Sequence, residues 1–287
     1  MLDMRLNRRT LTLSAAFALA SHKGVSAAAQ EAGIYTFAVL GLDRHTGGGS
    51  QRSDVIMLSR VDLNEYTVRT LSIPRDLYVE IPGYGYAKIN HAYQHGLELD
   101  PQLKWKSGAE MAVATITHNF GVACDGVAVL EFELMPEMID TLGGIEVHNP
   151  YAFADGGFDY PAGPITLNGD EATYFVRSRR HDGDGGRVMR QHLVLAAMLE
   201  KLQHPEVLPR IPGLVGALSD IVHTDISAGV QLQLVAALPL FRQEDLAFTN
   251  IEHLLWSDYT EGGAWIYQGD WSTLPQYVQS WLNGEID

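Results

Sequence analysis

The stretch YTFAVLGLDRHTGGGSQRSDVIMLSRV, residues 35–61, predicts the centre of the fold. Its first apolar run, 35–42, has the length and composition of a buried strand and ends at Asp43. A glycine-rich loop follows, and a second run at 55–61 again has the character of a strand. Two strands joined in this way bring Asp43 and Asp54 to the same edge of a sheet.

Strands and helices alternate along the rest of the chain, with no long linker, repeat or low-complexity segment after about residue 33. This alternation favours one α/β layered domain with a central mixed sheet, expected over residues 30–287. Further strands are predicted at 67–73, 126–133, 144–147, 247–254 and 264–268, and helices at 89–99, 107–121, 133–144, 167–179, 187–202, 211–222, 228–241 and 274–283.

Composition limits the class of partner. The chain has 287 residues, with 35 acidic against 20 basic side chains and a formal net charge of −15. A hydrophobic content of 46% and a charged content of 19% are typical of a globular protein. Nucleic acid is excluded as the main partner, because it requires a broad basic surface. The single cysteine, Cys124, cannot form an intrachain disulfide.

Residues 1–29 have the pattern of an export signal. Arg5, Arg8 and Arg9 precede an apolar segment at 10–21, and small-residue cleavage patterns follow. The apolar segment is shorter than the ~20 residues that a membrane-spanning helix needs. We therefore expect an exported protein that acts at the outer face of the membrane or in the cell wall. A disordered start of a cytosolic protein and an uncleaved anchor are the alternatives.

An arginine cluster stands out in this acidic chain. Within RSRRHDGDGGRVMRQ, residues 177–191, five arginines fall in fourteen positions: Arg177, Arg179, Arg180, Arg187 and Arg190. The pattern predicts that the first two end one helix and the last two begin the next, where unpaired backbone N–H groups also attract anions. Arginine binds phosphate in planar, bidentate fashion, so the cluster favours a diphosphate or phosphodiester ligand. A solvated charged surface is the alternative, and a calcium loop is excluded because the pattern fails at Gly186 and Arg187.

Two further groups of polar residues follow predicted strands. Asp43 and Asp54 could hold Mg²⁺ together with substrate phosphate oxygens, or else be a capping and a solvated aspartate. In SIPRD, Arg75 and Asp76 by themselves indicate only a surface ion pair. Lys88 and Asn90 lie near the start of the helix predicted next.

Four stretches taken together resemble one family. In order and spacing, DR…RSD, SIPRDLYVEIPGYG…KINHAY, IDTLGGIEV and LNGDEATYFVRSR…DGDGGRVMRQ are similar to the LytR-CpsA-Psr family, over roughly residues 34–285. The resemblance implies a three-layer α/β/α sandwich with an apolar pocket for a lipid tail. It also implies transfer of a glycopolymer phosphate from a polyprenyl-pyrophosphate carrier to a peptidoglycan sugar hydroxyl.

The resemblance also implies roles for individual residues. Asp43 and Asp54 would hold Mg²⁺, and Asp184 would orient arginines or assist proton removal. The catalytic set is completed by Arg75, Arg177, Arg179 and Arg187, and the substrate-binding set is Arg52, Asp76, Lys88, Asn90, Arg190 and Gln191.

Two positions depart from the family pattern. Gly185 stands where an aromatic residue is usual, and His192 where a second glutamine is usual. The leading hypothesis is a phosphotransferase whose partners are a polyprenyl-linked glycan, peptidoglycan and, through the lipid, the membrane surface. A hydrolase of the same pyrophosphate and a non-catalytic polyprenyl-phosphate-binding regulator of wall assembly are the alternatives.

Overall fold

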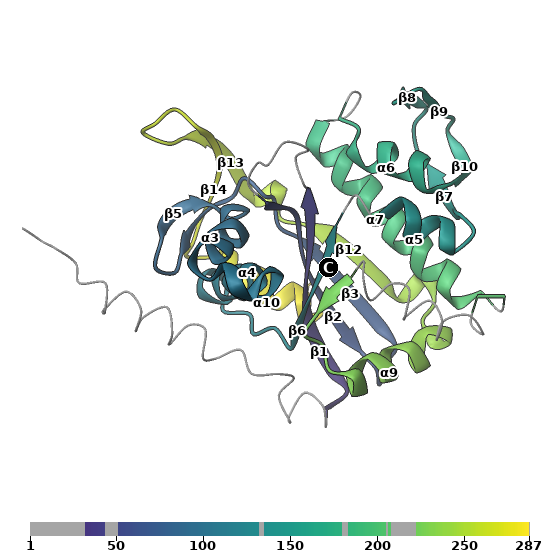
Figure 1. Cartoon of the computed structure of the whole chain (residues 1–287), viewed down its shortest axis with the longest axis horizontal. Helices are drawn as coiled ribbons and strands as arrows, with labels where there is room; N and C mark the ends of the chain where they lie inside the picture. The colour runs from purple at the N-terminus through teal and green to yellow at the C-terminus, as the bar shows by residue number, and fades with distance from the viewer. Residues whose placement is uncertain are drawn as a thin grey trace, which may run out of the picture.

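The computed structural model describes residues 32–43, 51–131, 135–179, 183–204, 206–207 and 222–286. At its centre lies a six-stranded sheet in the order β11-β6-β1-β2-β3-β12 (Figure 1). These strands are β1 (Ile34–Asp43), β2 (Arg52–Asp62), β3 (Thr67–Ser72), β6 (Gly126–Glu131), β11 (Val222–Thr224) and β12 (Leu246–Asn250). The sheet is mixed, as predicted: β6 is parallel to β1 and β12 to β3, whereas β2 is antiparallel to both of its neighbours.

The topology gathers strand ends at one edge. β1, β3, β6 and β12 all end there, and β2 begins there, because parallel neighbours share a direction and antiparallel neighbours reverse it. β1 meets β2 with a register shift between Gly41 and Leu42, so that Asp43 pairs with Arg52. The prediction that residues 43 and 54 come to one edge is therefore confirmed for the backbone.

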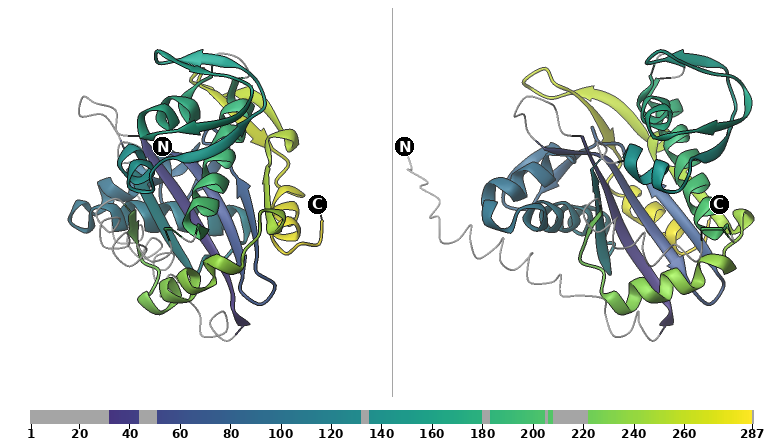
Figure 2. Two further views of the ribbon diagram at one scale, coloured as in Figure 1. Left: turned by 90° about the vertical axis from the view of Figure 1, so that its right-hand side faces the viewer. Right: turned by 45° about the vertical axis from the view of Figure 1, so that its right-hand side comes forward.

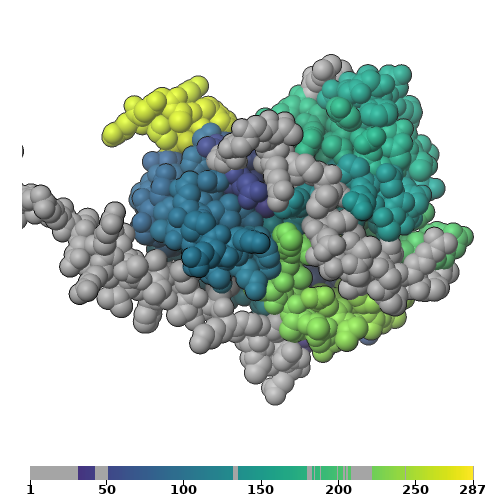
Figure 3. Space-filling model, in the orientation of Figure 1, coloured from purple at the N-terminus to yellow at the C-terminus, as the bar shows by residue number. Residues whose placement is uncertain are grey.

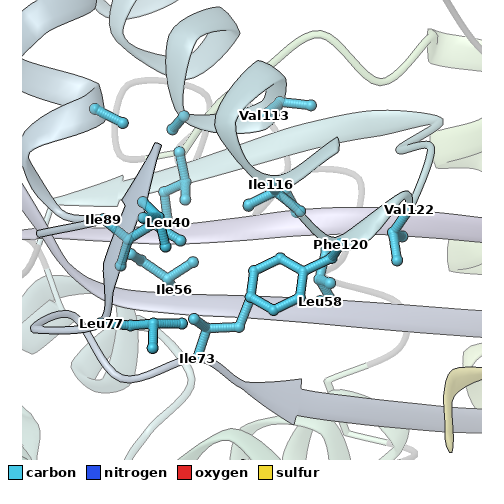
Figure 4. Packing of buried hydrophobic residues seen from close by; sticks show 14 of the residues in the cluster. Leu40, Ile56, Leu58, Ile73, Leu77, Ile89, Val113, Ile116, Phe120 and Val122 are labelled. Atoms are coloured by element: carbon cyan, nitrogen blue, oxygen red, sulfur yellow. The ribbon is translucent and has the colours of Figure 1, made fainter. Parts of the chain in front are cut away.

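One face of the sheet is covered by α3 (His91–Leu99), α4 (Trp105–Phe120) and α10 (Leu274–Leu282). Alternate strand residues point toward these helices, as the period of two requires. Leu40, Ile56 and Leu58 are almost fully buried there and pack against Ile116 and Phe120 of α4 (Figure 4). This is the main hydrophobic core, and burial of such side chains contributes about 1.5–3 kcal/mol each.

Close packing within this layer depends on glycine. An added Cβ at Gly108 of α4 would lie 2.8 Å from the ring of Tyr93, and one at Gly96 of α3 would lie 2.1 Å from the carbonyl oxygen of Ser107. The two helices can therefore approach only where side chains are absent. α4 ends at Gly121, whose φ of 67° is left-handed, as the sequence predicts for a glycine stop.

The opposite face carries two separate groups of helices, which give the third layer (Figure 2). α9 (Ala228–Ala237) packs against Tyr35 and Phe37 of β1. α5 (Met135–Thr141), α6 (Gly169–Arg177) and α7 (Gly183–Gln203) pack instead with the small sheet of β7 (Ile145–Asn149) and β10 (Gly163–Leu167). Because these three helices have a hydrophobic core of their own, they need not pack tightly against the central sheet.

Helix starts follow local sequence only in part. Asn168 caps α6, and Glu171 completes a reciprocal capping box. α7 was expected to begin at residue 187 and begins at Gly183 instead. Arg187 therefore lies more than one turn inside the helix, and the expectation that it joins unpaired N–H groups at a helix start is wrong.

Other elements were not predicted as the structure has them. These are the hairpins β4 (Tyr78–Ile81) with β5 (Gly85–Lys88), β8 (Phe153–Asp155) with β9 (Phe158–Tyr160), and β13 (Leu255–Tyr259) with β14 (Trp265–Gly269). Of these strands, β14 corresponds to the strand predicted at 264–268. The β13–β14 hairpin projects from the body of the molecule, where Figure 3 shows it in yellow. The helix expected at 211–222 and the segment 1–29 lie outside the described residues, apart from residue 222, which begins β11. Within the described part of the chain, no helix is both long and apolar enough to cross a membrane.

Candidate active site

A pocket with charged walls opens at the edge where the strands end. This polar pocket has about 360 Å³ of empty space, counting the part open to solvent. The strands contribute its floor, and α7 contributes one wall. Its lining residues are Asp54, Val55, Ile56, Ser72, Ile73, Pro74, Arg75, Arg187, Gln191, Asn250 and Glu252.

A charged network extends from the polar pocket, which Asp54 and Arg75 line, to Asp76, Lys88 and Asn90 beside it. Arg75 Nη1 donates to Asp54 Oδ2 at 2.5 Å, and Arg75 Nε donates to Asp76 Oδ2 at 3.3 Å. Lys88 Nζ donates to Asp76 Oδ1 at 2.6 Å, and Asn90 Nδ2 donates to Asp54 Oδ1 at 3.2 Å. All four charged side chains are at most 25% exposed. Arg75 and Asp76 are thus part of a half-buried network and not the isolated surface pair that SIPRD alone indicated.

Backbone register explains why these residues meet. β2 and β3 pair with Met57 opposite Ser72, and continuing this register outward places Asp54 opposite Arg75. The β4–β5 hairpin then brings Lys88 back opposite Tyr78. The backbone N–H of Asn90 donates to the carbonyl of Arg75 at 3.3 Å, which ties the start of α3 to the same corner.

Arg52, at the start of β2, adds positive charge near His91. Burial lowers the pKa of His91, and the nearby cations Arg52 and Lys88 lower it further. His91 is therefore held neutral beside this cationic corner. Arg52 is half-buried, and its Nε has no hydrogen-bond partner among the described residues. A group that carries negative charge would be stabilised here.

One face of α7 connects the charged region to an apolar one. Arg187, Gln191, Leu195 and Met198 succeed one another at four- and three-residue spacing, which places them along one side of the helix. Arg187 is 8% exposed and lines the polar pocket, and Gln191 follows one turn later. The sequence prediction that these two residues belong to one site agrees with their placement.

Arg190 lies elsewhere. Its guanidinium is 2% exposed, donates to the carbonyls of Phe175 at 2.9 Å and Ser178 at 2.6 Å, and stacks 4.9 Å from the ring of Phe153. It was expected to bind substrate, but this geometry ties the end of α6 to α7. The physical reason is helix phase, because residue 190 faces α6 whereas residue 187 faces the pocket.

The remaining predicted residues lie outside the polar pocket or have side chains outside the described structure. Arg177 and Arg179 are exposed at and just past the end of α6. Neither arginine is among the residues that line the polar pocket. The side chains of Asp43 and Asp184, and the whole of residues 180–182, lie outside the described structure.

Oxygen ligands for a hard cation gather beside Asp54. The described residues include no group of three His, Cys, Asp or Glu side chains close enough to hold a metal by themselves. Asp54 lies in the β2 bulge opposite the Gly41–Leu42 step of β1, two positions along β2 from Arg52, which pairs with Asp43. The Oδ1 atom of Asn90 is buried there and lacks a hydrogen-bond partner within the described residues. Such a donor set fits Mg²⁺ completed by phosphate oxygens and water, so the magnesium site stays a prediction.

An apolar pocket lies directly behind the polar one, between the central sheet and α5, α6 and α7. It has about 690 Å³ of empty space, counting the part open to solvent. The sheet contributes side chains that alternate with the buried core positions, and four methionines make the walls adaptable. Its lining residues are Val39, Gly41, Val55, Met57, Leu130, Glu131, Met135, Met138, Val176, Gln191, Val194, Leu195 and Met198. Val55 and Gln191 line both pockets, so the two adjoin at these residues.

Sequence reasoning missed several pocket residues. Ser72 Oγ lies 2.7 Å from His192 Nε2, and the His192 ring stacks on Phe248. Burial lowers the pKa of His192 to about 4, so this imidazole is neutral. Asn250 and Glu252 were missed because β12 was expected to continue to residue 254, whereas it ends at Asn250. The rule that polar residues at strand ends form sites would have found them if that end had been placed correctly.

Cys124 lines neither the polar nor the apolar pocket. It packs against the main core, and burial raises the pKa of its thiol to about 12.

Comparison with known proteins shows the family of this chain. A model described as the LytR_cpsA_psr family matches residues 7–280. The polyisoprenyl-teichoic acid–peptidoglycan teichoic acid transferase TagU of Halalkalibacterium halodurans is 29% identical over 256 residues, which are 88% of this chain and 78% of that protein. The protein of the same name from Oceanobacillus iheyensis is 34% identical over 190 residues, 66% of this chain, and the match spans only 58% of that relative.

Solved structures agree with the fold. The crystal structure of TagU from B. subtilis superposes with a TM-score of 0.64 at 26% identity, covering 87% of this chain and 96% of that one. The arrangement of a mixed central sheet between helical layers is therefore shared with this protein.

Proposed function

The chain belongs to the LytR-CpsA-Psr family, and from this premise we propose that it transfers a glycopolymer phosphate from a polyprenyl-pyrophosphate carrier to a sugar hydroxyl of peptidoglycan. The TagU relatives are named as teichoic acid transferases that act between a polyisoprenyl carrier and peptidoglycan. Teichoic acid is one glycopolymer that such a reaction would carry.

One observation carries the proposal, namely that the apolar and polar pockets adjoin and share Val55 and Gln191 in their walls. A polyprenyl pyrophosphate is an apolar chain joined to a compact multiple anion. The apolar pocket suits the chain, because each buried CH₂ contributes about 0.8 kcal/mol. The polar pocket suits the pyrophosphate, because Arg75 and Arg187 both line it.

The proposed reaction requires positioning and neutralised charge more than covalent help from the protein. Arg187, held on a helix, and Arg75, held by Asp54 and Asp76, would bind phosphate oxygens from two sides. Lys88 and Arg52 would add positive charge at the same corner. Mg²⁺, if bound at Asp43 and Asp54, would offset charge on the phosphate oxygens. Exclusion of water by the apolar walls would strengthen each of these interactions.

Roles for Arg177, Arg179 and Asp184 follow from the family resemblance. We propose that the two arginines at the end of α6 contact the glycan side of the pyrophosphate, and that Asp184 orients arginines. Export of the chain with residues 1–29 as signal peptide, and action at the membrane surface, are parts of the same proposal. An outward location would give the lipid carrier access to the pocket.

The test uses a synthetic polyprenyl-pyrophosphate disaccharide as donor and a soluble peptidoglycan oligomer as acceptor. Formation of a phosphodiester-linked product, detected by mass spectrometry, is expected for the wild-type chain, with Mg²⁺ increasing the rate. Release of free glycan phosphate without linked product would establish the hydrolase alternative. Tight binding of donor without any product would establish the non-catalytic alternative.

A further inference from the structure

One carboxylate of the polar pocket has no role so far. Glu252 follows β12 and begins the short 3₁₀ helix Glu252–Leu254. β12 pairs in parallel with β3, with Asn250 opposite Ser72, so both strands end at the same edge. Glu252 consequently lines the same pocket as Arg75 and Arg187, although more than sixty residues separate it from either in sequence.

The Glu252 carboxylate is oriented through one of its oxygens. The hydroxyl of Tyr267 donates a hydrogen bond to Glu252 Oε1. Tyr267 is held in turn by its backbone N–H, which donates to the carbonyl of Asp76 at 3.0 Å, and by a bridge to Leu77. The projecting β13–β14 hairpin thus connects Glu252 to the charged network.

The second oxygen, Oε2, points toward Gly185 at the start of α7. A Cβ added at Gly185 would lie 3.8 Å from Glu252 Oε2, which is ordinary van der Waals contact. Because residue 185 is glycine, it has no side chain that covers this oxygen. No hydrogen bond from the described residues reaches Oε2.

The other described carboxylates at this corner are already engaged. Both oxygens of Asp54 accept hydrogen bonds, from Arg75 and Asn90, and both oxygens of Asp76 accept from Arg75 and Lys88. A substrate proton could reach these oxygens only in competition with the donors that already bind them. Within the described lining of the polar pocket, Glu252 is the carboxylate that keeps an oxygen for a substrate.

We propose that Glu252 is the general base that receives the proton of the acceptor hydroxyl; this inference rests on the proposed transferase function. The hydroxyl oxygen forms a new bond to the glycan-bearing phosphorus, and the bridging P–O bond to the carrier phosphate breaks. The electron pair of that bond leaves with polyprenyl phosphate, next to Arg75 and Arg187. The hydroxyl proton passes to Glu252 Oε2 and from there to solvent or to the departing phosphate.

The main experiment compares Glu252→Gln with wild type in the donor–acceptor assay. General-base catalysis contributes roughly 100-fold or more, so transfer should fall by about that factor while binding of the unreacted donor stays at the wild-type level. Tyr267→Phe keeps the carboxylate but removes its orienting hydrogen bond, and should lower transfer about threefold to tenfold. Glu244→Gln removes an exposed carboxylate that lines neither pocket and serves as the matched control.

An assay with small alcohols as acceptors distinguishes loss of general-base catalysis from a structural defect in the variant. With trifluoroethanol in place of ethanol as acceptor, the hydroxyl gives up its proton more readily and depends less on a base. The defect of Glu252→Gln should therefore shrink by about tenfold with the more acidic alcohol. A structural defect would be equal for both alcohols. If Glu252→Gln melts early, Glu252→Asp, which keeps a carboxylate one methylene shorter, takes its place, with the same acceptor dependence expected.

Two failures can be told apart. Wild-type protein that transfers to an acceptor, with Glu252→Gln transferring equally fast, would overturn the role of Glu252 and leave the transferase function standing. Wild-type protein that binds the donor but forms no linked product would refute the transferase function and, with it, the base.

Discussion

The polar and apolar pockets share two residues and little else in chemistry. Their common wall is α7, where Arg187 and Gln191 give way to Leu195 and Met198 along one face. The central sheet makes the same transition, from Asp54 at the strand edge to Val55 and Met57 within the strand. The side chains of α7 and those of the central sheet thus change from charged to apolar in the same direction, from the polar pocket to the apolar one. An amphipathic ligand with a charged head and a long tail requires this geometry.

The two pockets also differ in how their walls are held. The charged network is fixed by ion pairs and backbone register, whereas the apolar pocket exists because α5, α6 and α7 pack on their own small sheet. Substitutions in the polar pocket should therefore affect chemistry, and those in the apolar pocket should affect binding of the tail. The predictions below test this division.

The largest effect is expected for Asp54→Ala. This change removes the partner of both Arg75 and Asn90 and one proposed ligand of Mg²⁺. Loss of a preorganised charge in such a site typically lowers turnover by about 100-fold or more. The measurement is product formation across a Mg²⁺ titration, in which the variant should lose its metal dependence as well. Full turnover that a chelator still abolishes would place the metal elsewhere.

A smaller but sharper contrast is expected within α7. Arg187→Lys keeps the charge and loses the bidentate fork, so turnover should fall about tenfold with an unchanged melting temperature. Arg190→Lys should instead melt early, because its buried guanidinium loses bonds to two carbonyls, each worth about 1.5–3 kcal/mol. Thermal melts run beside the turnover assay decide the matter. Early melting of the residue 187 variant would make that arginine structural too.

In the apolar pocket, Leu195→Asn should weaken donor binding by roughly fivefold to tenfold through loss of apolar area and burial of an amide. The effect should grow with tail length and nearly vanish for a donor with one isoprene unit. Affinity is measured over a series of tail lengths with the pyrophosphate head kept constant. An equal loss for all lengths would show that the tail lies elsewhere.

The smallest effect at neutral pH is expected for His192→Gln. Burial lowers the pKa of His192 to about 4, below its ordinary value of 6.5, so between these pH values the unfolded chain binds more protons than the folded one. Above about pH 6.5 the buried imidazole is neutral in both states and does not lower the free energy of unfolding. As the pH falls toward 4, the free energy of unfolding decreases by at most about 3 kcal/mol. Unfolding free energies of wild type and variant, measured from pH 7.5 to 4, should diverge in that interval. Parallel curves would contradict a buried neutral imidazole.

Much of the fold was predictable from local patterns. The apolar runs of β1, β2 and β3 and the glycine that ends the helix predicted at 107–121 are short-range signals, and each was confirmed. Apart from the strand at 264–268, which corresponds to β14, the strands of the short hairpins were not predicted, because strands of three to five residues carry too few positions for a period of two to be recognised.

The candidate site was predictable only where strand ends were placed correctly. Asp54 and Arg75 were identified as strand-end residues, but their direct ion pair depends on the register of β2 against β3. Arg187 and Arg190 looked equivalent in sequence, and the phase of a helix that begins at Gly183 separated them. Glu252 required both the true end of β12 and its parallel pairing with β3.

The sequence by itself determined which chemical groups this protein has available. It is an acidic chain with clustered arginines, aspartates at strand ends, and motifs whose order along the chain is typical of one family. Only the tertiary structure decided which of these side chains meet. Pairing between strands joins residues about 20 to 200 positions apart, as with Asp54 and Arg75 or Arg75 and Glu252, and helix phase turns a side chain toward a pocket or into a core. Neither depends on near neighbours in the chain, because both are set by which apolar faces become buried together.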